Sequence, residues 1–462
     1  MIKTESLESS WSIRGLGQAL EQKRISSLEA TRCFLDRIAG SAHLNAFITV
    51  LEEQALESAG ASDARRAKNE SIGPLDGIPL AVKDLFGIRG VPTTMGCTYY
   101  ESDIAERDAF VISLLRRAGA VIIGKTNTSQ FAMGPTGELS SYGPCRNPQN
   151  TALVAGGSSS GSAAAVAADL CCAALGTDTG GSIRLPAALC GLVGLKPTMS
   201  LISTRGVAPL SVSLDTVGPL TRNIWDNAVL LNHLTVYDAL DWRNAPLQAQ
   251  DYTARLEDGI ADGKITLAVN AFEDIDDTLS SALDHALATL KKTAGLCREA
   301  VLPDLGEFQA AHRKLLVMGG HQAQLRLIQA DAPDILPDVL ARLKTGAGLS
   351  SDVYIACERL KEQFIDLFDT AFGDAEVLIT PVSPLPPVPV GTKDILLNGR
   401  SVPVTPTYLR LTWMANLSGF PSLSLPVGIS RTGLPVGLMM TAKPYDEANL
   451  YRYARALERE LS

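Results

Sequence analysis

Residues 156–168 read GGSSSGSAAAVAA, a stretch in which glycine and serine give way to alanine. The alanine run predicts a closely packed helix, and the serines before it can cap the start of that helix. The first backbone N–H groups of a helix have no intrahelical acceptor, so they can also face an anionic or polar group. The stretch is therefore compatible with a structural cap or with part of a site.

A second serine follows 24 residues after Ser158, directly behind two consecutive glycines. Residues 176–184 read GTDTGGSIR, with Ser182 as this serine, and follow the apolar run at 171–175. Glycine adopts positive φ angles at little cost, so consecutive N–H groups can converge there on an anion. The loop predicts either an oxyanion hole or a plain turn between a strand and a helix.

The base that would activate a serine is not an obvious histidine. The sequence has five histidines, and all lie outside residues 156–198: positions 43, 233, 285, 312 and 321. Lys83 ends an apolar strand predicted at 78–82, where burial would lower its pKa from about 10.4. A neutral lysine can deprotonate a serine. A lone lysine at a strand end is more simply a solvated charge, so its role is inferred from the combination with the two serines.

The hydrophobic pattern alternates between strands and helices, which is typical of an α/β protein. Ser26 and Glu29 can form a capping box at the start of the first predicted helix. The prolines within 381–387 exclude a helix or a central strand, so this run is predicted to be an extended loop. Helices are predicted at 26–38, 111–118, 279–293, 351–372 and 446–461, and strands at 78–82, 120–124 and 375–380.

Apolar residues make up 46% of the 462-residue chain and charged residues 20%, which is the balance of a globular protein. The formal net charge of -9 argues against an extended phosphate-binding surface, so nucleic acid is not an expected partner. Residues 1–8 carry acids where a secretory signal has basic and apolar regions, and no run of 18 apolar residues occurs. A cytoplasmic protein without membrane contact is expected.

The eight cysteines are scattered and show no metal-ligand spacing. Several lie in apolar runs, such as the one at 170–173, so we expect reduced core residues rather than disulfides or metal ligands. They stand at positions 33, 97, 145, 171, 172, 190, 297 and 357.

Taken together, these stretches resemble the amidase signature family. The resemblance rests on residues 156–163, 176–184 and 190–198, the last of which read CGLVGLKPT. It is strong from about 70 to 235, returns at 375–391 and 413–440, and is weak between. Further matches are GIPLAVKD at 77–84, GKTN at 124–127 and DTVGPL at 215–220.

The resemblance implies an α/β fold: a single large α/β/α domain around a twisted mixed β-sheet, spanning residues 1–462. Within it, residues 1–69 are expected to form N-terminal helices and residues 70–235 the catalytic core. Residues 236–374 are expected to form a variable helical region, and residues 375–462 the C-terminal part of the core.

The resemblance also implies hydrolysis of an amide C–N bond, with Ser182 as nucleophile, Ser158 as bridging serine and Lys83 as base. A cis peptide bond is implied between Gly157 and Ser158. The proton of Ser182 would pass through Ser158 to Lys83, and water would hydrolyse the acyl-enzyme, with no metal or other cofactor. The backbone N–H groups implied to hold the oxyanion are those of Thr179, Gly180, Gly181 and Ser182, and the residues implied to support the loop are Asp178, Arg184 and Ser159.

One departure from the family is Gln130, which stands where many relatives carry an acid. Met133, Gly134 and Trp413 are predicted to contact the substrate, because specificity in the family is determined by variable segments. These segments are 128–146, 310–365 and 408–416 in this chain. The expected partner is a small-molecule amide: aliphatic and aryl amides, ureido compounds, indoleacetamide-like substrates and peptide amides all stay open, as does a homodimer.

Three alternatives are weighed against this hypothesis. Residues 157–161 also match Gly-x-Ser-x-Gly, which would make Ser159 the nucleophile of an α/β-hydrolase, but residues 147–151 do not predict the strand that must precede it. The chain could instead be the glutaminase-type subunit of a tRNA-dependent amidotransferase, although residues 341–344 do not resemble the corresponding part of such proteins. The third alternative, a non-catalytic scaffold, is disfavoured because both serines and the lysine are present.

Overall fold

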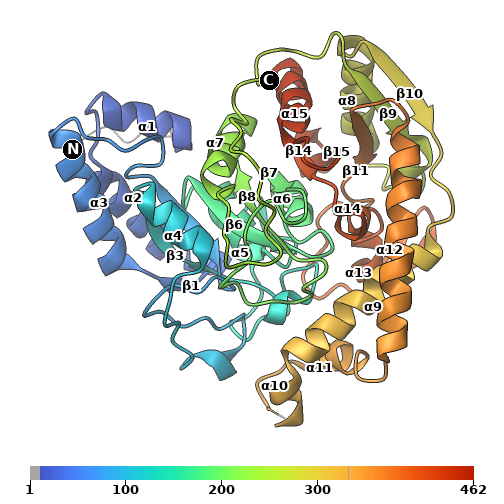
Figure 1. Cartoon of the computed structure of the whole chain (residues 1–462), viewed down its shortest axis with the longest axis horizontal. Helices are drawn as coiled ribbons and strands as arrows, with labels where there is room; N and C mark the ends of the chain where they lie inside the picture. The colour runs from blue at the N-terminus through green and yellow to red at the C-terminus, as the bar shows by residue number, and fades with distance from the viewer. Residues whose placement is uncertain (1–10, 331, 462) are drawn as a thin grey trace.

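The computed structural model describes residues 11–330 and 332–461, and one eleven-stranded sheet runs through them (Figure 1). The prediction for the acidic residues 1–8 lies outside the described residues. In spatial order the strands are β1 (Phe47–Val50), β3 (Val121–Thr126), β2 (Pro79–Lys83), β6 (Ala173–Asp178), β8 (Thr216–Thr221), β7 (Val193–Lys196), β14 (Ser422–Ile429), β15 (Pro435–Ala442), β11 (Val377–Pro381), β9 (Lys264–Ala268) and β10 (Leu296–Ala300).

Neighbouring strands of this sheet pair in both directions. β2 is parallel to both β3 and β6, whereas β8 is antiparallel to β6 and β7. The predicted α/β class with a mixed sheet is therefore confirmed. Because β2 and β6 are parallel neighbours, their carboxyl ends meet at one edge of the sheet, and the segments that follow them lie close together.

Helices cover both faces of the sheet. Helices α5 (Ser160–Ala167) and α6 (Arg184–Cys190) pack together on one face, and α15 (Glu447–Leu461) joins α7 (Ile224–Leu234) and α8 (Ser280–Thr293) on the other. In the described part of the chain, no helix has the length and apolar character needed to cross a bilayer. The other helices are α1 (Ile13–Glu21), α2 (Ser27–Gly40), α3 (Glu52–Ala67), α4 (Phe110–Arg117), α9 (Gly306–Ala323), α10 (Leu325–Gln329), α11 (Pro337–Lys344), α12 (Ser351–Phe372), α13 (Val404–Tyr408) and α14 (Trp413–Ser418).

The predicted helices and strands are confirmed, with ends that shift by one or two residues. At the start of α2, Ser26 Oγ accepts from the Glu29 amide at 3.1 Å, and Glu29 Oε2 accepts from the Ser26 amide at 2.9 Å, so the capping box forms as predicted. The proline-rich run leaves β11 as an extended loop, and a single bridge ties Pro389 to Leu153.

Two segments that were predicted to be helical also supply strands. The segment 1–69 contributes β1, and the segment 236–374 contributes β9 and β10 at the far edge of the sheet. The purely helical prediction is wrong there because β9 is a short apolar run, which periodicity cannot distinguish from part of a buried helix. β10 is mostly exposed, so its hydrophobic pattern is weak. Two ribbons lie outside the sheet: β4 (Arg146–Asn147) with β5 (Asn150–Val154), and β12 (Asp394–Leu397) with β13 (Arg400–Pro403).

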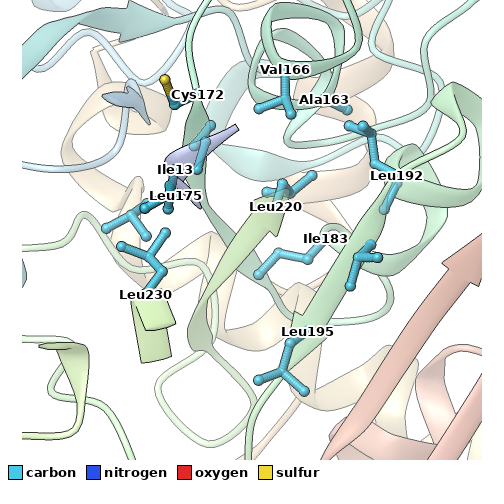
Figure 2. Close-up of a cluster of buried hydrophobic side chains, with 14 of the residues drawn as sticks. Ile13, Ala163, Val166, Cys172, Leu175, Ile183, Leu192, Leu195, Leu220 and Leu230 are labelled. Atoms are coloured by element: carbon cyan, nitrogen blue, oxygen red, sulfur yellow. The ribbon is translucent and has the colours of Figure 1, made fainter. Parts of the chain in front are cut away.

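The main core fills the space between the sheet and its covering helices. Figure 2 shows part of it, with Leu175 of β6, Leu220 of β8 and Val166 of α5 in one buried cluster. The central strands β2, β3, β6, β7 and β8 are buried at every position, as strands covered on both faces are. All eight cysteines are free, and only Cys33 and Cys297 are not buried, so the prediction of reduced thiols, most of them in the core, is confirmed.

Helix α5 packs its first turn against the backbone of two other segments. A Cβ added at Gly161 would overlap the carbonyl oxygen of Ala46 and the backbone of Asn127. The Gly161 N–H donates to the Asn127 carbonyl at 2.9 Å, so this N–H group does not face a ligand, and the sequence-based expectation of an open helix start is wrong at this position. The lack of a side chain at residue 161 therefore allows the serine-rich segment to pack directly against the residue that follows β3, and the hydrogen bond holds it there.

Replacing Gly161 with alanine is expected to destabilise the protein by at least about 1–3 kcal/mol, because the new methyl group collides with rigid backbone. Gly60 is the matched control: it lies inside α3 with nothing within 4 Å of an added Cβ. Gly60→Ala should stabilise the protein by about 0.5–1 kcal/mol through helix propensity. Thermal unfolding measures both variants, and equal midpoints for the two would contradict this account of the packing.

Candidate functional site

Lys83 lies at the carboxyl end of β2, between the neighbouring strands β3 and β6, and is fully buried. Its Nζ is 2.7 Å from Ser158 Oγ and 2.8 Å from Thr177 Oγ1, and no carboxylate lies within ion-pair distance of it among the described residues. Burial lowers the pKa of Lys83 to about 7, although Asp178 and Asp215 act in the opposite direction. A large share of this amine is therefore neutral near pH 7, and it directly contacts a serine hydroxyl.

Ser158 is buried in the segment between β5 and α5, and its peptide bond to Gly157 is cis, in agreement with the family resemblance. The next residue links this segment to the second serine loop, because the Ser159 amide donates to the Ser182 carbonyl at 3.2 Å. The three residues implied by the resemblance, Lys83, Ser158 and Ser182, are thus brought together from three separate parts of the chain.

Ser182 follows β6 in the loop that leads into α6, and it is partly exposed to a cavity. The loop winds around the buried carboxylate of Asp178, which accepts from the backbone N–H groups of Gly181 at 2.7 Å and Ile183 at 3.1 Å. Although burial acts against ionisation, the Arg184 guanidinium 3.0 Å away lowers the pKa of Asp178 below its usual range. A charged Asp178 therefore fixes the conformation of the loop from inside.

Three backbone N–H groups of this loop have no acceptor within the described chain: those of Thr179, Gly180 and Ser182. All three residues line the same cavity. Buried N–H groups without a partner are rare in folded proteins, so three of them around one serine are typical of an anion-binding site. The Gly181 N–H, which the resemblance assigned to the same set, is instead bonded to Asp178.

The carbonyl groups of the loop are held on the side away from these N–H groups. His312 Nε2 lies 2.9 Å from the Thr179 oxygen, and Thr412 Oγ1 donates to the Gly180 oxygen at 2.6 Å. Because a trans peptide is planar, its C=O and N–H groups point in opposite directions, so the Gly180 N–H points away from His312. Two side chains from distant helical regions thus orient the loop.

His312 and Thr412 are functional candidates that the sequence analysis missed. His312 is buried, and burial lowers its pKa to about 4, so the ring is neutral and donates from Nε2 to the carbonyl. It lies on α9, about 130 residues after the loop that it contacts. No local motif marks either residue; only their positions within segments predicted to determine specificity could have suggested them.

The predicted supporting residues form a buried network beneath the loop. Arg184 Nη2 donates to Asn416 Oδ1 at 2.8 Å, and Asn416 Nδ2 donates to Asp178 Oδ1 at 2.8 Å, so α14 is tied to the loop. Ser159 Oγ lies 3.2 Å from the Thr177 carbonyl oxygen and accepts from the Thr177 amide at 3.3 Å. Asn416 was predicted only as part of a specificity segment, yet its contacts are those of a supporting residue.

The alternative nucleophile Ser159 is fully buried and does not line the cavity. A strand, β5, does precede the Gly-x-Ser-x-Gly match, contrary to the expectation from residues 147–151. This strand belongs to a small ribbon with β4 and not to the main sheet, so it does not build the strand–turn–helix elbow of an α/β-hydrolase. The geometry around Ser159 therefore does not support the α/β-hydrolase hypothesis.

A cavity of about 380 Å³ opens in front of Ser182. It is lined by residues 179, 180 and 182 of the loop after β6, by residues 132–135, and by residues from segments 309–345 and 405–413. Met133, Gly134 and Trp413 are among them, so the residues predicted to contact the substrate do line the cavity. Its walls are mostly apolar, as in most small-molecule sites. Within the described residues, no cluster of His, Cys, Asp and Glu side chains suited to a metal ion occurs.

Gln130, the departure from the family pattern, is a buried tether. Its Nε2 donates to the Asp334 carbonyl at 2.8 Å and to Ser141 Oγ at 2.7 Å, and its Oε1 accepts from the Leu336 amide at 2.9 Å. A carboxylate could accept but could not donate, so glutamine is the residue that fits these partners. Gln130 thereby holds the start of α11, which lines the cavity.

Comparisons with known proteins show the family to which this chain is related. A family model described as Amidase matches residues 29–451. A glutamyl-tRNA(Gln) amidotransferase subunit of Geobacter sp. (strain M21) is 37% identical to this chain over 475 residues, covering 97% of this chain and 96% of that protein.

Two solved structures share the fold over nearly the whole chain. One, described as revealing the origins of an s-triazine catabolic enzyme through a vestigial protein complex, has a TM-score of 0.93 and 32% identity, and covers 97% of this chain and 98% of its own. The other, the glutamyl-tRNA(Gln) amidotransferase subunit of the same name from Thermotoga maritima, has a TM-score of 0.79 and 29% identity, and covers 97% and 94%.

Replacing His312 with leucine removes the donor that holds the Thr179 carbonyl, so the loop should lose part of its orientation. We expect kcat for an amide substrate to fall about tenfold or more, because the free N–H groups act mainly on the transition state. His312→Gln keeps an uncharged N–H donor and should recover much of the loss. Steady-state kinetics test this, and a glutamine variant no better than the leucine variant would argue against an orienting role.

Proposed function

We propose that this chain, which belongs to the amidase signature family, hydrolyses the C–N bond of a small amide with Ser182 as nucleophile. The observation that carries the proposal is the 2.7 Å contact between Lys83 Nζ and Ser158 Oγ, both fully buried, beside a cavity that Ser182 lines. A buried amine that contacts a serine and no carboxylate is suited to take up a proton.

In the proposed reaction, Ser182 Oγ attacks the amide carbonyl carbon while its proton moves to Ser158 and the Ser158 proton moves to Lys83. The carbonyl π electrons pass to the oxygen, which the N–H groups of Thr179, Gly180 and Ser182 stabilise as an oxyanion. When the oxyanion collapses, the C–N bond breaks and the proton returns through Ser158 to the leaving nitrogen. Water then attacks the acyl-enzyme by the same relay and releases the acid.

Thr177 supports this relay by orienting Lys83. A neutral amine has two N–H bonds and one lone pair. If one N–H donates to Thr177 Oγ1 at 2.8 Å, the lone pair can face Ser158 at 2.7 Å. The hydroxyl of Thr177 thus favours the rotamer of Lys83 in which the amine can accept the proton. This positioning role is part of the proposal.

A second candidate, the glutaminase-type subunit of an amidotransferase, is supported by the relative from Geobacter sp., which is named as an amidotransferase subunit and matches along 97% of this chain. Both candidates use the same chemistry on an amide C–N bond, and they differ in substrate and partners. The two solved structures, with TM-scores of 0.93 and 0.79, share the same fold, so they support both candidates and do not separate them.

Ammonia release from a panel of primary amides separates the two candidates. We expect the purified chain alone to hydrolyse at least one small amide other than L-glutamine. Activity restricted to L-glutamine, and present only after partner proteins from the native host are added, would instead establish the glutaminase-type subunit. The Ser182→Ala variant, assayed in parallel, reports the background.

Ser182→Ala and Lys83→Ala should each lower kcat by at least about 10³-fold, because the nucleophile and the base act as one unit and removing either one stops the relay. Ser160→Ala is a matched control: it changes a buried serine of the same segment whose hydroxyl contacts the Asn127 carbonyl at 3.4 Å and the Cys145 thiol, and neither Lys83 nor Ser158. That control should keep most of its activity. Circular dichroism checks that all three variants fold, and near-normal turnover by the Ser182 or Lys83 variant would overturn the assignment.

The rate should depend on pH through Lys83. Only the neutral amine accepts a proton, so kcat/KM should be low below pH 7, rise through about 7, and level off above it. Lys196 is the control, because burial lowers its pKa to about 7 too, while its Nζ donates to the Pro197 carbonyl, away from the serines. Lys196→Met should keep the profile. In Thr177→Val, the ammonium form of Lys83 loses the hydroxyl that accepts its hydrogen bond, so its pKa should fall and the acidic limb of the pH profile should move to lower pH. An unchanged acidic limb would contradict the contact between Lys83 and Thr177.

A further inference from the structure

The cavity in front of Ser182 carries positive charge and no negative charge in its lining. Arg313 on α9 and Arg342 on α11 are its charged side chains within the described residues, and neither aspartate nor glutamate lines it. His312 beside them is neutral, because burial lowers its pKa to about 4. In a chain with a net charge of -9, a cationic cavity is a local departure from the overall composition.

Arg342 is half-buried and lacks a counterion. The only hydrogen bond that its guanidinium forms within the described structure is a long one, 3.5 Å from Nη1 to the Met133 carbonyl. Burial lowers the pKa of Arg342, and Asp338, one turn earlier on α11, opposes this without forming an ion pair. Arg184, by contrast, is paired with Asp178 at 3.0 Å. The guanidinium of Arg342 therefore has donors left for a ligand.

Arg313 contributes a second cation to the lining of the same cavity. It is exposed, and it forms neither a hydrogen bond nor an ion pair with the part of the chain that the structure describes. It follows His312 directly, so α9 presents to the cavity both the side chain that orients the nucleophile loop and a free guanidinium. Helices α9 and α11 are neighbours and lie together in the lower part of Figure 1.

We propose that the substrate is an amide that carries a carboxylate, which Arg342 and Arg313 bind while the amide carbonyl lies in the Thr179–Gly180 loop. This inference rests on the proposed function and specifies its substrate class. A guanidinium recognises a carboxylate through charge-assisted, often bidentate hydrogen bonds. Apolar side chains between the two ends, such as Met133 and Leu316, suit a short hydrocarbon spacer.

The same lining disfavours an α-ammonium group on the substrate. A cavity with two arginines and no acid offers no countercharge to an ammonium, and like charges repel more strongly in a partly desolvated site. The monoamide of a simple dicarboxylic acid is therefore preferred over L-glutamine, which carries an ammonium beside its carboxylate. The expected preference for such a monoamide therefore differs from that of a glutaminase-type subunit, whose substrate is L-glutamine.

The test compares three matched amides on the wild-type chain: glutaramate, its methyl ester and pentanamide, with L-glutamine as a fourth. Replacing the carboxylate by the neutral ester should lower kcat/KM by at least about 30-fold, mainly through KM. L-Glutamine should be poorer than glutaramate. Equal kcat/KM for glutaramate and its ester overturns the inference but leaves the proposed function intact, whereas hydrolysis of none of the panel, and of no other amide, counts against the proposed function itself.

Arg342→Met keeps the aliphatic stem and removes the charge. It should abolish the preference for glutaramate while activity on pentanamide stays within about threefold, and Arg313→Met should weaken the preference only about threefold because that residue is exposed. Lys344→Met is the control, since it removes an exposed cation from α11 that does not line the cavity, and it should leave the preference unchanged. If Arg342→Met lowers kcat/KM equally for glutaramate and for pentanamide, the inference is overturned. If that variant does not fold, Arg313→Met and the wild-type substrate comparison decide.

Discussion

The buried carboxylate of Asp178 is the constraint on which the candidate site depends. It stands at the end of β6, takes up the N–H groups of Gly181 and Ile183, and is paired with Arg184, which in turn holds Asn416. Removing one partner of such a pair leaves an uncompensated buried charge and costs about 3–5 kcal/mol. Because the carboxylate takes some N–H groups of the loop, it also determines which ones stay free for a ligand.

Lys83 is the opposite case, a buried ionisable group with no contacting carboxylate among residues 11–330 and 332–461. The sheet topology explains its position: β2 and β6 are parallel, so the residue that ends β2 lies beside Thr177 near the end of β6. Ionisation of Lys83 is unfavourable there because the amine is desolvated, and the more distant Asp178 and Asp215 recover only part of that energy. The fold therefore pairs one buried cation with a carboxylate and leaves another unpaired, which is the arrangement that a lysine base needs.

The sequence was sufficient for the parts of the molecule that depend on local chemistry. The capping box at Ser26, the strand that ends at Lys83 and the glycine-rich loop before Ser182 all follow from spacing and residue type, and they form as predicted. Strands β9 and β10 could not be predicted, because a short apolar run and an exposed edge strand have no distinctive period. His312 and Thr412 could not be predicted either, since their role consists of one tertiary hydrogen bond each to a carbonyl far away in sequence.

The site thus combines two kinds of structure. Lys83 ends β2 and Ser182 follows β6, and both strands are buried at every position, which leaves little room for change there. Much of the cavity wall comes from α9, α11 and the segment before α14, which pack in hydrophobic clusters apart from the main core and are tied to the site by hydrogen bonds such as those of Gln130 and His312. A substitution in this wall can therefore alter which amide enters without disturbing Lys83 or Ser158. Helix α9 is the exception, because His312 contacts the loop and the adjacent Arg313 lines the cavity, so a change in this helix can affect the loop and the cavity together.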